Sequence, residues 1–153
     1  MTASNPICVD MTLTKLQCEV SGGRYVFAQP LTVTSLGVQN KYVFYRACTK
    51  CPKRLTNHVC PVHGYQREHV NRFALRVLLS DSIGSECWCT CFDANVVKIL
   101  GFTANDYVQM ETDEQRYESM STLRGSQVTV VIRKRVTKEY VNYIAEEINI
   151  VNM

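Results

Sequence analysis

Four potential metal ligands stand in two pairs with the same spacing. Cys48 and Cys51 are separated by two residues, and the same gap separates Cys60 from His63. Pairs of this kind form two knuckles whose side chains can surround one ion, and three thiolates with one imidazole suit the borderline-soft zinc ion. The pattern therefore predicts a Zn²⁺ cofactor held by Cys48, Cys51, Cys60 and His63.

The fourth ligand is less constrained than the three cysteines. We favour His63, because its two-residue gap from Cys60 lets both side chains turn toward one ion. His58 and His69 lie close enough in the sequence to replace it. A site closed by four protein ligands leaves no position for water, so the predicted site is structural and not catalytic.

Two disulfides or four free thiols are the alternative interpretation of the same residues. Disulfides need an oxidising compartment. The first residues, MTASNPICVD, have neither the basic start nor the apolar run of a secretory signal. No segment reaches the apolar length that spans a bilayer. We therefore expect a reduced, intracellular protein with one structural metal and no membrane association.

The composition is that of one ordinary globular domain. The chain has 153 residues, of which 46% are hydrophobic and 20% charged, and this length allows a full core. The formal charge of +3 is mild. It permits an acidic partner such as a nucleic acid without requiring one.

Runs of β-branched and aromatic residues indicate strands through most of the chain. The predicted strands are residues 11–20, 25–36 with an interruption at Pro30, 41–47, 69–79, 87–92, 127–136 and 140–151. The continuous apolar end of 69–79 suggests burial on both faces. Helical signals follow residue 92: residues 94–100 and 104–110, then a stretch to about Leu123, with Asp93, Thr103 and Thr112 as the expected N-caps.

This order predicts a mainly β protein with the five-stranded OB-fold barrel, in which a helical connection joins strands 3 and 4. Residues 1–24 would form an N-terminal extension or an edge strand. Residues 25–153 would form the OB domain, with a zinc ribbon inserted at 48–64.

The strand 87–92 (CWCTCF) alternates along its length. Because side chains alternate across a strand, Cys87, Cys89 and Cys91 share one face, which we assign to the core. Trp88 and Phe92 then point outward, where their rings offer surfaces on which bases can stack. The alternative is that helices or loops cover these rings as a secondary core.

Basic residues favour the same surface. Arg133 and Arg135 share one face of their strand, opposite Ile132 and Lys134. A second basic group lies on the strand that enters the metal site and on the first knuckle: Lys41, Arg46, Lys50, Lys53 and Arg54. Such groups can meet phosphates, although a solvated charged surface would have the same composition.

The order of these motifs resembles the C-terminal DNA-binding OB domain of the replication protein A large subunit and its paralogues, over roughly residues 25–151. In that family an Ala-Cys pair opens a zinc ribbon, as Tyr45-Arg-Ala-Cys48 does here. The Trp-x-Thr-x-Phe strand is matched by Trp88, Thr90 and Phe92, and the following helices by NVVKILG (95–101) and Asp113-Glu-Gln115.

The resemblance implies single-stranded DNA binding through the groove aromatics, a ribbon that stabilises the fold, and assembly with smaller OB-fold subunits or telomerase proteins in the nucleus. Two departures suggest a specialised paralogue, such as a telomerase-associated one. The ribbon is compact and its last ligand is His63 in place of cysteine. The family also adds a trimerisation helix after its last strand, and the sequence to Met153 does not include one.

Two functions remain open at this point. In the first, a single-stranded DNA-binding domain uses Trp88, Phe92, Tyr45, Arg46, Lys53, Arg133 and Arg135, with Tyr107 as a further stacking candidate. In the second, the OB domain holds partner subunits with little DNA contact, because surface aromatics also serve protein interfaces. We do not expect an enzyme, since the sequence has no paired carboxylates at an open metal position and no glycine loop for phosphate.

Overall fold

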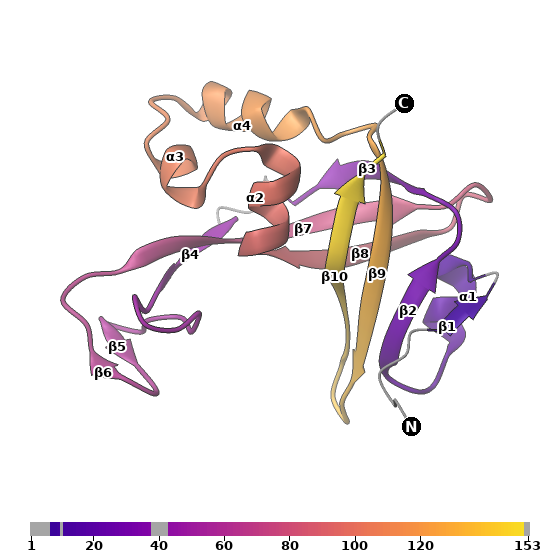
Figure 1. Cartoon of the computed structure of the whole chain (residues 1–153), viewed down its shortest axis with the longest axis horizontal. Helices are drawn as coiled ribbons and strands as arrows, with labels where there is room; N and C mark the ends of the chain where they lie inside the picture. Colours follow the sequence, from indigo (N-terminus) through magenta and orange to yellow (C-terminus); the bar gives the residue numbers. More distant parts are fainter. Residues whose placement is uncertain (1–6, 10, 38–42, 152–153) are drawn as a thin grey trace.

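Most of the predicted strands form one barrel in a computed structural model that describes residues 7–9, 11–37 and 43–151 (Figure 1). The strands are β1 (Ile7–Val9), β2 (Gly23–Phe27), β3 (Leu31–Leu36), β4 (Phe44–Ala47), β5 (Val59–Cys60), β6 (Gly64–Tyr65), β7 (Val70–Ser80), β8 (Glu86–Phe92), β9 (Gln127–Val136) and β10 (Val141–Ile150). The helices are α1 (Leu13–Cys18), α2 (Asp93–Leu100), α3 (Ala104–Val108) and α4 (Asp113–Ser121).

The barrel closes because β3 pairs with strands at both ends of the series. The order β9-β10-β8-β7-β3 returns to β9 through the pairs Leu31–Val128 and Thr32–Gln127. β2 precedes β3 in the chain and is separated from it by the break at Pro30; it also pairs with β9. Four of the five barrel pairings are antiparallel. The fifth, between β10 and β8, is parallel and pairs Ile144 with Thr90. The mainly β, five-stranded OB architecture predicted from the sequence is confirmed.

Alternating side chains fill the barrel. Cys87, Cys89 and Cys91 are buried, as predicted, and face Leu75 and Val77 in the core. The apolar end of β7 is only partly buried on its second face, because Leu78 is half-buried between the buried Val77 and Leu79. Its residues alternate, so Leu75, Val77 and Leu79 are buried while Arg76 between them is exposed.

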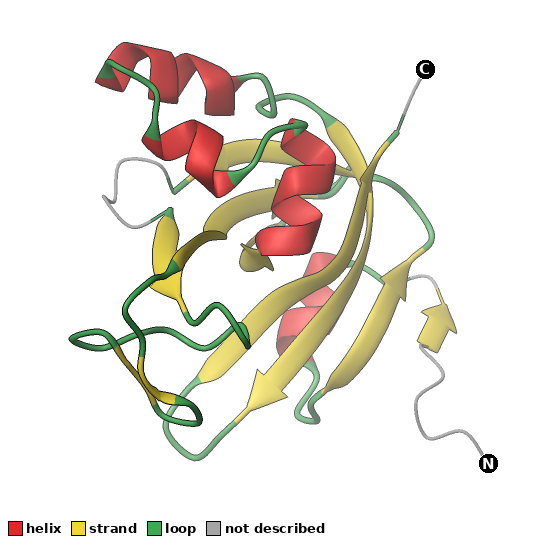
Figure 2. Cartoon of the chain, turned by 60° about the vertical axis from the view of Figure 1, so that its left-hand side comes forward, coloured by secondary structure: helices red, strands yellow, loops and turns green. Residues whose placement is uncertain are grey.

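The helical connection between β8 and β9 begins and ends at recognisable caps. Gly101, at φ 85°, ends α2 in the left-handed region that glycine favours. Thr103 with Asp106, and Thr112 with Gln115, form the capping boxes of α3 and α4. The three helices lie together over one side of the barrel (Figure 2).

Asp93 does not cap α2 as predicted. Phe92 occupies the N-cap position, and Asp93 is the first helical residue. Its carboxylate accepts a hydrogen bond from the backbone N–H of Phe73 at 2.9 Å and pairs with Arg72 at 3.6 Å. The carboxylate therefore ties α2 to β7 and leaves the cap without a side-chain acceptor.

Residues 13–18 form a helix, not the strand predicted over 11–20. Thr12 caps α1 by accepting a hydrogen bond from the N–H of Lys15, and Leu13 and Leu16 are completely buried in the core. The β1 strand pairs in parallel with β2 as an edge strand, in line with the prediction for the N-terminal residues. Part of the predicted strand 41–47 lies outside the described residues, and β4 begins at Phe44.

Candidate metal centre and outer barrel face

The four predicted ligands lie on a knuckle between the end of β4 and the start of β7, which projects from the barrel (Figure 1). β4 ends at Ala47, so Cys48 enters the knuckle directly. Its N–H donates to the carbonyl of Lys53 at 3.0 Å, which closes the first loop. The β5–β6 hairpin carries Cys60 and closes the second.

The ligand atoms are spaced as a tetrahedral metal site requires. Cys48 Sγ lies 3.6 Å from His63 Nδ1, Cys51 Sγ lies 3.6 Å from Cys60 Sγ, and Cys60 Sγ lies 3.7 Å from His63 Nδ1. All four atoms fall within 4.8 Å of one another. A tetrahedron with zinc–sulfur bonds of about 2.3 Å has edges of about 3.8 Å. The four residues are therefore close enough to bind one metal ion.

The geometry selects His63 among the three histidines. His58 has left-handed backbone with φ 66°, and its ring packs against Tyr65 at 6.2 Å between centroids. His69 lies outside the cluster. The disulfide alternative does not fit, because Cys51 and Cys60 are free cysteines whose sulfur atoms are 3.6 Å apart, well beyond a bond of about 2.05 Å.

Backbone N–H groups point at the ligand sulfurs. Lys50 N–H donates to Cys48 Sγ and Val62 N–H to Cys60 Sγ, each at 3.4 Å. Burial would raise the pKa of the Cys60 thiol, but hydrogen bonds from the backbone of His63 and Val62 outweigh burial and lower the pKa to about 6. These donors favour the thiolate, which is the form that binds metal.

The aromatic residues of β8 lie on the outside of the barrel, as their alternation predicts. Trp88 is 38% exposed and Phe92 is 45% exposed. The Arg76 guanidinium lies over the Trp88 ring, 5.1 Å from its centroid, and Arg76 pairs in register with Thr90. Trp88 thus has a cation on one side and remains partly open to solvent.

The same surface continues toward the knuckle. Tyr45 pairs with Arg72 across β4 and β7, so both side chains lie on one face. The Tyr45 hydroxyl donates to the Pro52 carbonyl at 2.9 Å, and the Arg54 guanidinium lies 5.2 Å from the Tyr45 ring centroid. We call this surface the aromatic face; its residues are Tyr45, Arg72, Arg76, Trp88, Thr90 and Phe92.

An arginine group borders the aromatic face on the other side of β10. Arg133 and Arg135 are exposed, whereas Ile132 and Lys134 are buried, as the alternation predicts. Arg133 pairs in register with Ile144 of β10 and with Arg24 of β2. Because Ile144 in turn pairs with Thr90, one row of outward side chains runs Arg76, Thr90, Ile144, Arg133 and Arg24.

Two predicted contact residues do not reach this surface. Tyr107 is 7% exposed and packs edge-on against Phe44 and Phe73, so its ring offers no face to a base. Arg46 follows Tyr45 in β4 and therefore points to the opposite face. Lys53 is exposed on the knuckle.

Sequence reasoning missed three arginines that the fold adds. Arg72 and Arg76 were overlooked because the prediction for residues 69–79 considered only the apolar end of the strand and assigned no face to its arginines. Their two-residue alternation with Phe73 and Leu75 was the available signal. Arg24 was assigned to the N-terminal extension, and only its pairing with Arg133 reveals its position.

The family model described as the replication factor-A C terminal domain matches residues 29–151. The comparison with curated protein sequences gives no match. A chain of a replication protein A heterotrimer bound to ssDNA has a similar fold, with a TM-score of 0.74 and 13% identity over 93% of this chain. The match covers 36% of that longer chain, so the present chain spans about a third of it.

Two further structures share the fold. A chain of yeast RPA bound to ssDNA matches with a TM-score of 0.67 and 20% identity, over 97% of this chain and 92% of that one. A chain from the crystal structure of fission yeast Pot1 and Tpz1 matches with a TM-score of 0.52 and 12% identity, over 98% of both chains. Together with the family match over most of its length, the barrel and its inserted knuckle show that the chain belongs to the replication factor-A C-terminal domain family.

Proposed function

We propose that the chain is a single-stranded DNA-binding OB domain of a replication protein A-like large subunit, with a structural zinc ion in its knuckle. The observation that carries the proposal is the aromatic face, on which two exposed rings lie beside arginines on β7. The knuckle and the β9–β10 hairpin project from the same side of β7 and β8 and flank this face (Figures 1 and 2). OB folds bind oligonucleotides on the face of these two barrel strands, between the corresponding loops.

Bases and phosphates would meet different groups. Trp88 and Phe92 would stack bases, a contact worth about 1–3 kcal/mol per base and tolerant of sequence. Phosphates would meet the arginines of the row and Lys53 on the knuckle. Tyr45, fixed by its hydroxyl bond to Pro52, would form the end of the path nearest the metal site.

Zinc is the metal that the donor set suits best. Three thiolates and an imidazole at tetrahedral spacing are typical of structural zinc sites, and the four protein ligands leave no open position. When bound, the ion would supply cross-linking of the two knuckle loops. Because the Lys53 carbonyl accepts the Cys48 N–H, the basic knuckle residues depend on this closed arrangement.

The relatives suggest a setting for this activity. Two of the similar solved structures are replication protein A bound to ssDNA, one of them as a heterotrimer, and the third is Pot1 with Tpz1. We extend these to the present chain as a proposal: it would work in the nucleus and assemble with smaller OB-fold subunits. A telomeric role is the finer part of the proposal and would appear as a preference for G-rich repeats.

Fluorescence anisotropy with a labelled oligo-dT tests the DNA-binding proposal. The wild type, Trp88→Ala and Tyr117→Ala would be compared at low salt. Tyr117 is a matched control, because it is a 49% exposed aromatic residue on α4, away from the aromatic face. We expect Trp88→Ala to weaken binding about tenfold or more and Tyr117→Ala to leave it unchanged. Equal affinities for all three proteins would contradict the proposal.

A partner-binding function is favoured by a different surface. Val59, Val62 and Tyr65 on the knuckle are 45%, 63% and 71% exposed, and apolar side chains gathered at one site often mark a protein interface. Folded, metal-loaded protein that binds no DNA in the same assay would support this second candidate.

A further inference from the structure

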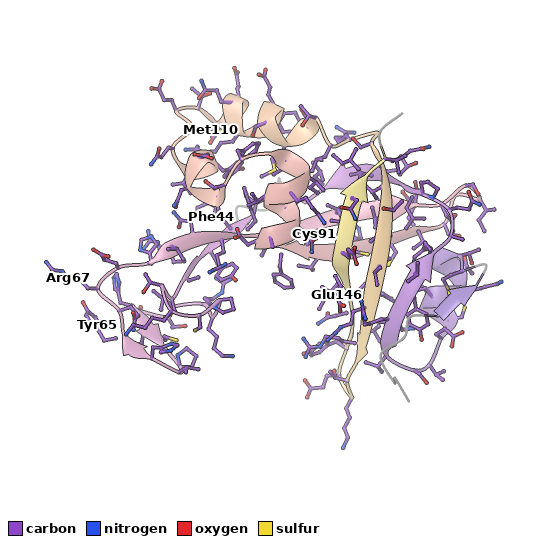
Figure 3. The ribbon with its side chains drawn as sticks, viewed as in Figure 1. Phe44, Tyr65, Arg67, Cys91, Met110 and Glu146 are labelled. Atoms are coloured by element: carbon purple, nitrogen blue, oxygen red, sulfur yellow. The ribbon has the colours of Figure 1, made fainter. Side chains whose placement is uncertain are left out.

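One carboxylate holds two arginines at the edge of the aromatic face. Glu146 Oε1 lies 2.6 Å from Arg24 Nε, and Glu146 Oε2 lies 2.5 Å from Arg133 Nε. The three side chains are 29%, 31% and 50% exposed for Glu146, Arg24 and Arg133. Solvent and solutes can therefore reach the group, which Figure 3 places on β10 through the labelled Glu146.

A break in strand pairing puts Glu146 in this position. Ala145 pairs with Ile132 and Glu147 pairs with Val131, so Glu146 is an extra residue in β10. The side-chain amide of Asn95 on α2 donates to the Glu146 carbonyl at 2.9 Å and holds this bulge. Bulges re-aim side chains and are common next to functional sites. The fold thus directs Glu146 toward the arginines from a third element.

Arg24 and Arg133 lie close enough to the aromatic face to contact a nucleic acid bound there. Arg133 is joined to Thr90 of the aromatic face through Ile144, across neighbouring strands. Adjacent strands lie about 4.8 Å apart, so Arg133 is roughly 10 Å from the β8 backbone. A nucleic-acid strand stacked on Trp88 or Phe92 would bring its backbone within reach of this pair.

We propose that Arg24 and Arg133 form a phosphate-binding subsite in which the Glu146 carboxylate takes the place of the phosphate when no DNA is bound. This inference rests on the proposed single-stranded DNA-binding function. A carboxylate and a phosphate present similar oxygen pairs to a guanidinium group. Glu146 therefore orders both arginines before binding, and a phosphate must displace it to gain their full charge.

The charges of the three side chains predict whether neutralising Glu146 strengthens or weakens DNA binding. Arg24, Arg133 and Glu146 together carry one net positive charge, and removal of the carboxylate leaves two. Replacement by the neutral isostere Gln should therefore strengthen attraction for phosphate at low salt and make binding more salt-dependent. Each further phosphate neutralised on a single strand adds about −0.7 to the slope of log K against log salt concentration.

The test measures oligo-dT affinity by anisotropy across a salt series for wild type, Glu146→Gln, Glu147→Gln and the double variant Glu146→Gln/Arg133→Gln. Glu147→Gln is the matched control: it makes the same charge change one residue away, where Glu147 is exposed and pairs with Val131. Thermal melting would verify that every variant is folded.

We expect Glu146→Gln to bind roughly fivefold more tightly than Glu147→Gln at low salt, to have the steeper slope, and to lose this gain in the double variant. Equal affinities and slopes for the two single variants, or weaker binding by Glu146→Gln, would overturn the subsite while leaving a Trp88-dependent DNA-binding function intact. No binding by wild type and by Glu146→Gln would overturn both proposals.

Discussion

At the scale of single residues, the buried side chain of Lys134 on β9 caps the C-terminal end of α1. Its ammonium donates to the carbonyl oxygens of Leu16, Gln17 and Glu19 at the end of α1. The Leu16 carbonyl also accepts a hydrogen bond from the Glu19 N–H at 3.3 Å. Carbonyls at the end of a helix run out of intrahelical donors, and a cation is favourable beside them. Lys134 is 3% exposed, so its three donors are satisfied by the backbone and not by water.

Loss of this ammonium should be costly. Lys134→Met keeps the length of the side chain but removes the ammonium that donates to the carbonyls of Leu16, Gln17 and Glu19, so we expect the free energy of unfolding to fall by roughly 2–4 kcal/mol. Urea denaturation measures the change. Lys138→Met, on the exposed turn between β9 and β10, is the control and should change stability little. A Lys134→Met protein as stable as the control would show that water replaces the ammonium.

The metal ligands make a second prediction at this scale. Cys51→Ser should lower both the zinc content and the melting temperature, because a structural ion contributes directly to folding. Cys18→Ser is the control, since Cys18 is an exposed free cysteine outside the cluster. Metal analysis and differential scanning calorimetry on the same samples check both effects. An unchanged melting temperature with lost metal would mean that the knuckle folds independently of the ion.

At the scale of elements, α1 belongs to the barrel. Its first N–H donates to the Asp81 carboxylate, while Lys134 occupies its last carbonyls, so opposite charges hold the two ends of the helix. Two of its leucines enter the core. Residues that the sequence assigned to an extension therefore contribute to the fold.

A substitution in α1 tests this contribution. Leu16 is completely buried, so Leu16→Ala should reduce the free energy of unfolding by about 2–5 kcal/mol through lost burial and a cavity. Val20→Ala removes an apolar side chain that is 87% exposed and should have almost no effect. Similar stabilities of the two variants in urea denaturation would indicate that α1 is only loosely attached.

The elements also show what could be predicted from the sequence. Alternation located β8 and β9 and placed the side chains of residues 87–92 and 132–135 on the correct faces, because these segments have one buried and one more exposed side. α1 was missed because a helix of 6 residues shows less than two turns of its period. Spacing also favoured His63 over the other two histidines, and the structure brings it to the three cysteines. The bulge at Glu146 and the position of Arg24 depend on strand pairings between residues distant in sequence, which spacing does not reveal.

At the scale of the whole molecule, the small net charge conceals a strong separation of charges. Acidic residues collect on α3, α4 and the turn between them: Asp106, Glu111, Asp113, Glu114 and Glu118. The helices lie on one side of β7 and β8, while the knuckle and the β9–β10 hairpin lie on the other (Figure 1). The arginines of the outer face thus act on a ligand more strongly than a formal charge of +3 suggests. No helix in the described part of the chain is long and apolar enough to cross a membrane.

This separation predicts the salt dependence of the wild type. With four or five phosphates neutralised on the outer face, log K against log salt concentration should have a slope of about −3 for single-stranded DNA. Anisotropy titrations between low and physiological salt give the slope. A slope near zero would mean that stacking alone accounts for the affinity, and that the arginines remain with their protein partners.

The three cysteines inside the barrel have a consequence for chemical labelling. Burial raises the pKa of the Cys91 thiol to about 12, and Cys87 and Cys89 are buried beside it. Among the cysteines that the structure describes, an alkylating reagent should therefore reach the exposed Cys18 first. If the knuckle binds a metal, its three cysteines should react only after that metal is removed, and the barrel cysteines only when the barrel opens. The mass of the alkylated protein would report, for each molecule, whether the knuckle, the barrel or neither has unfolded.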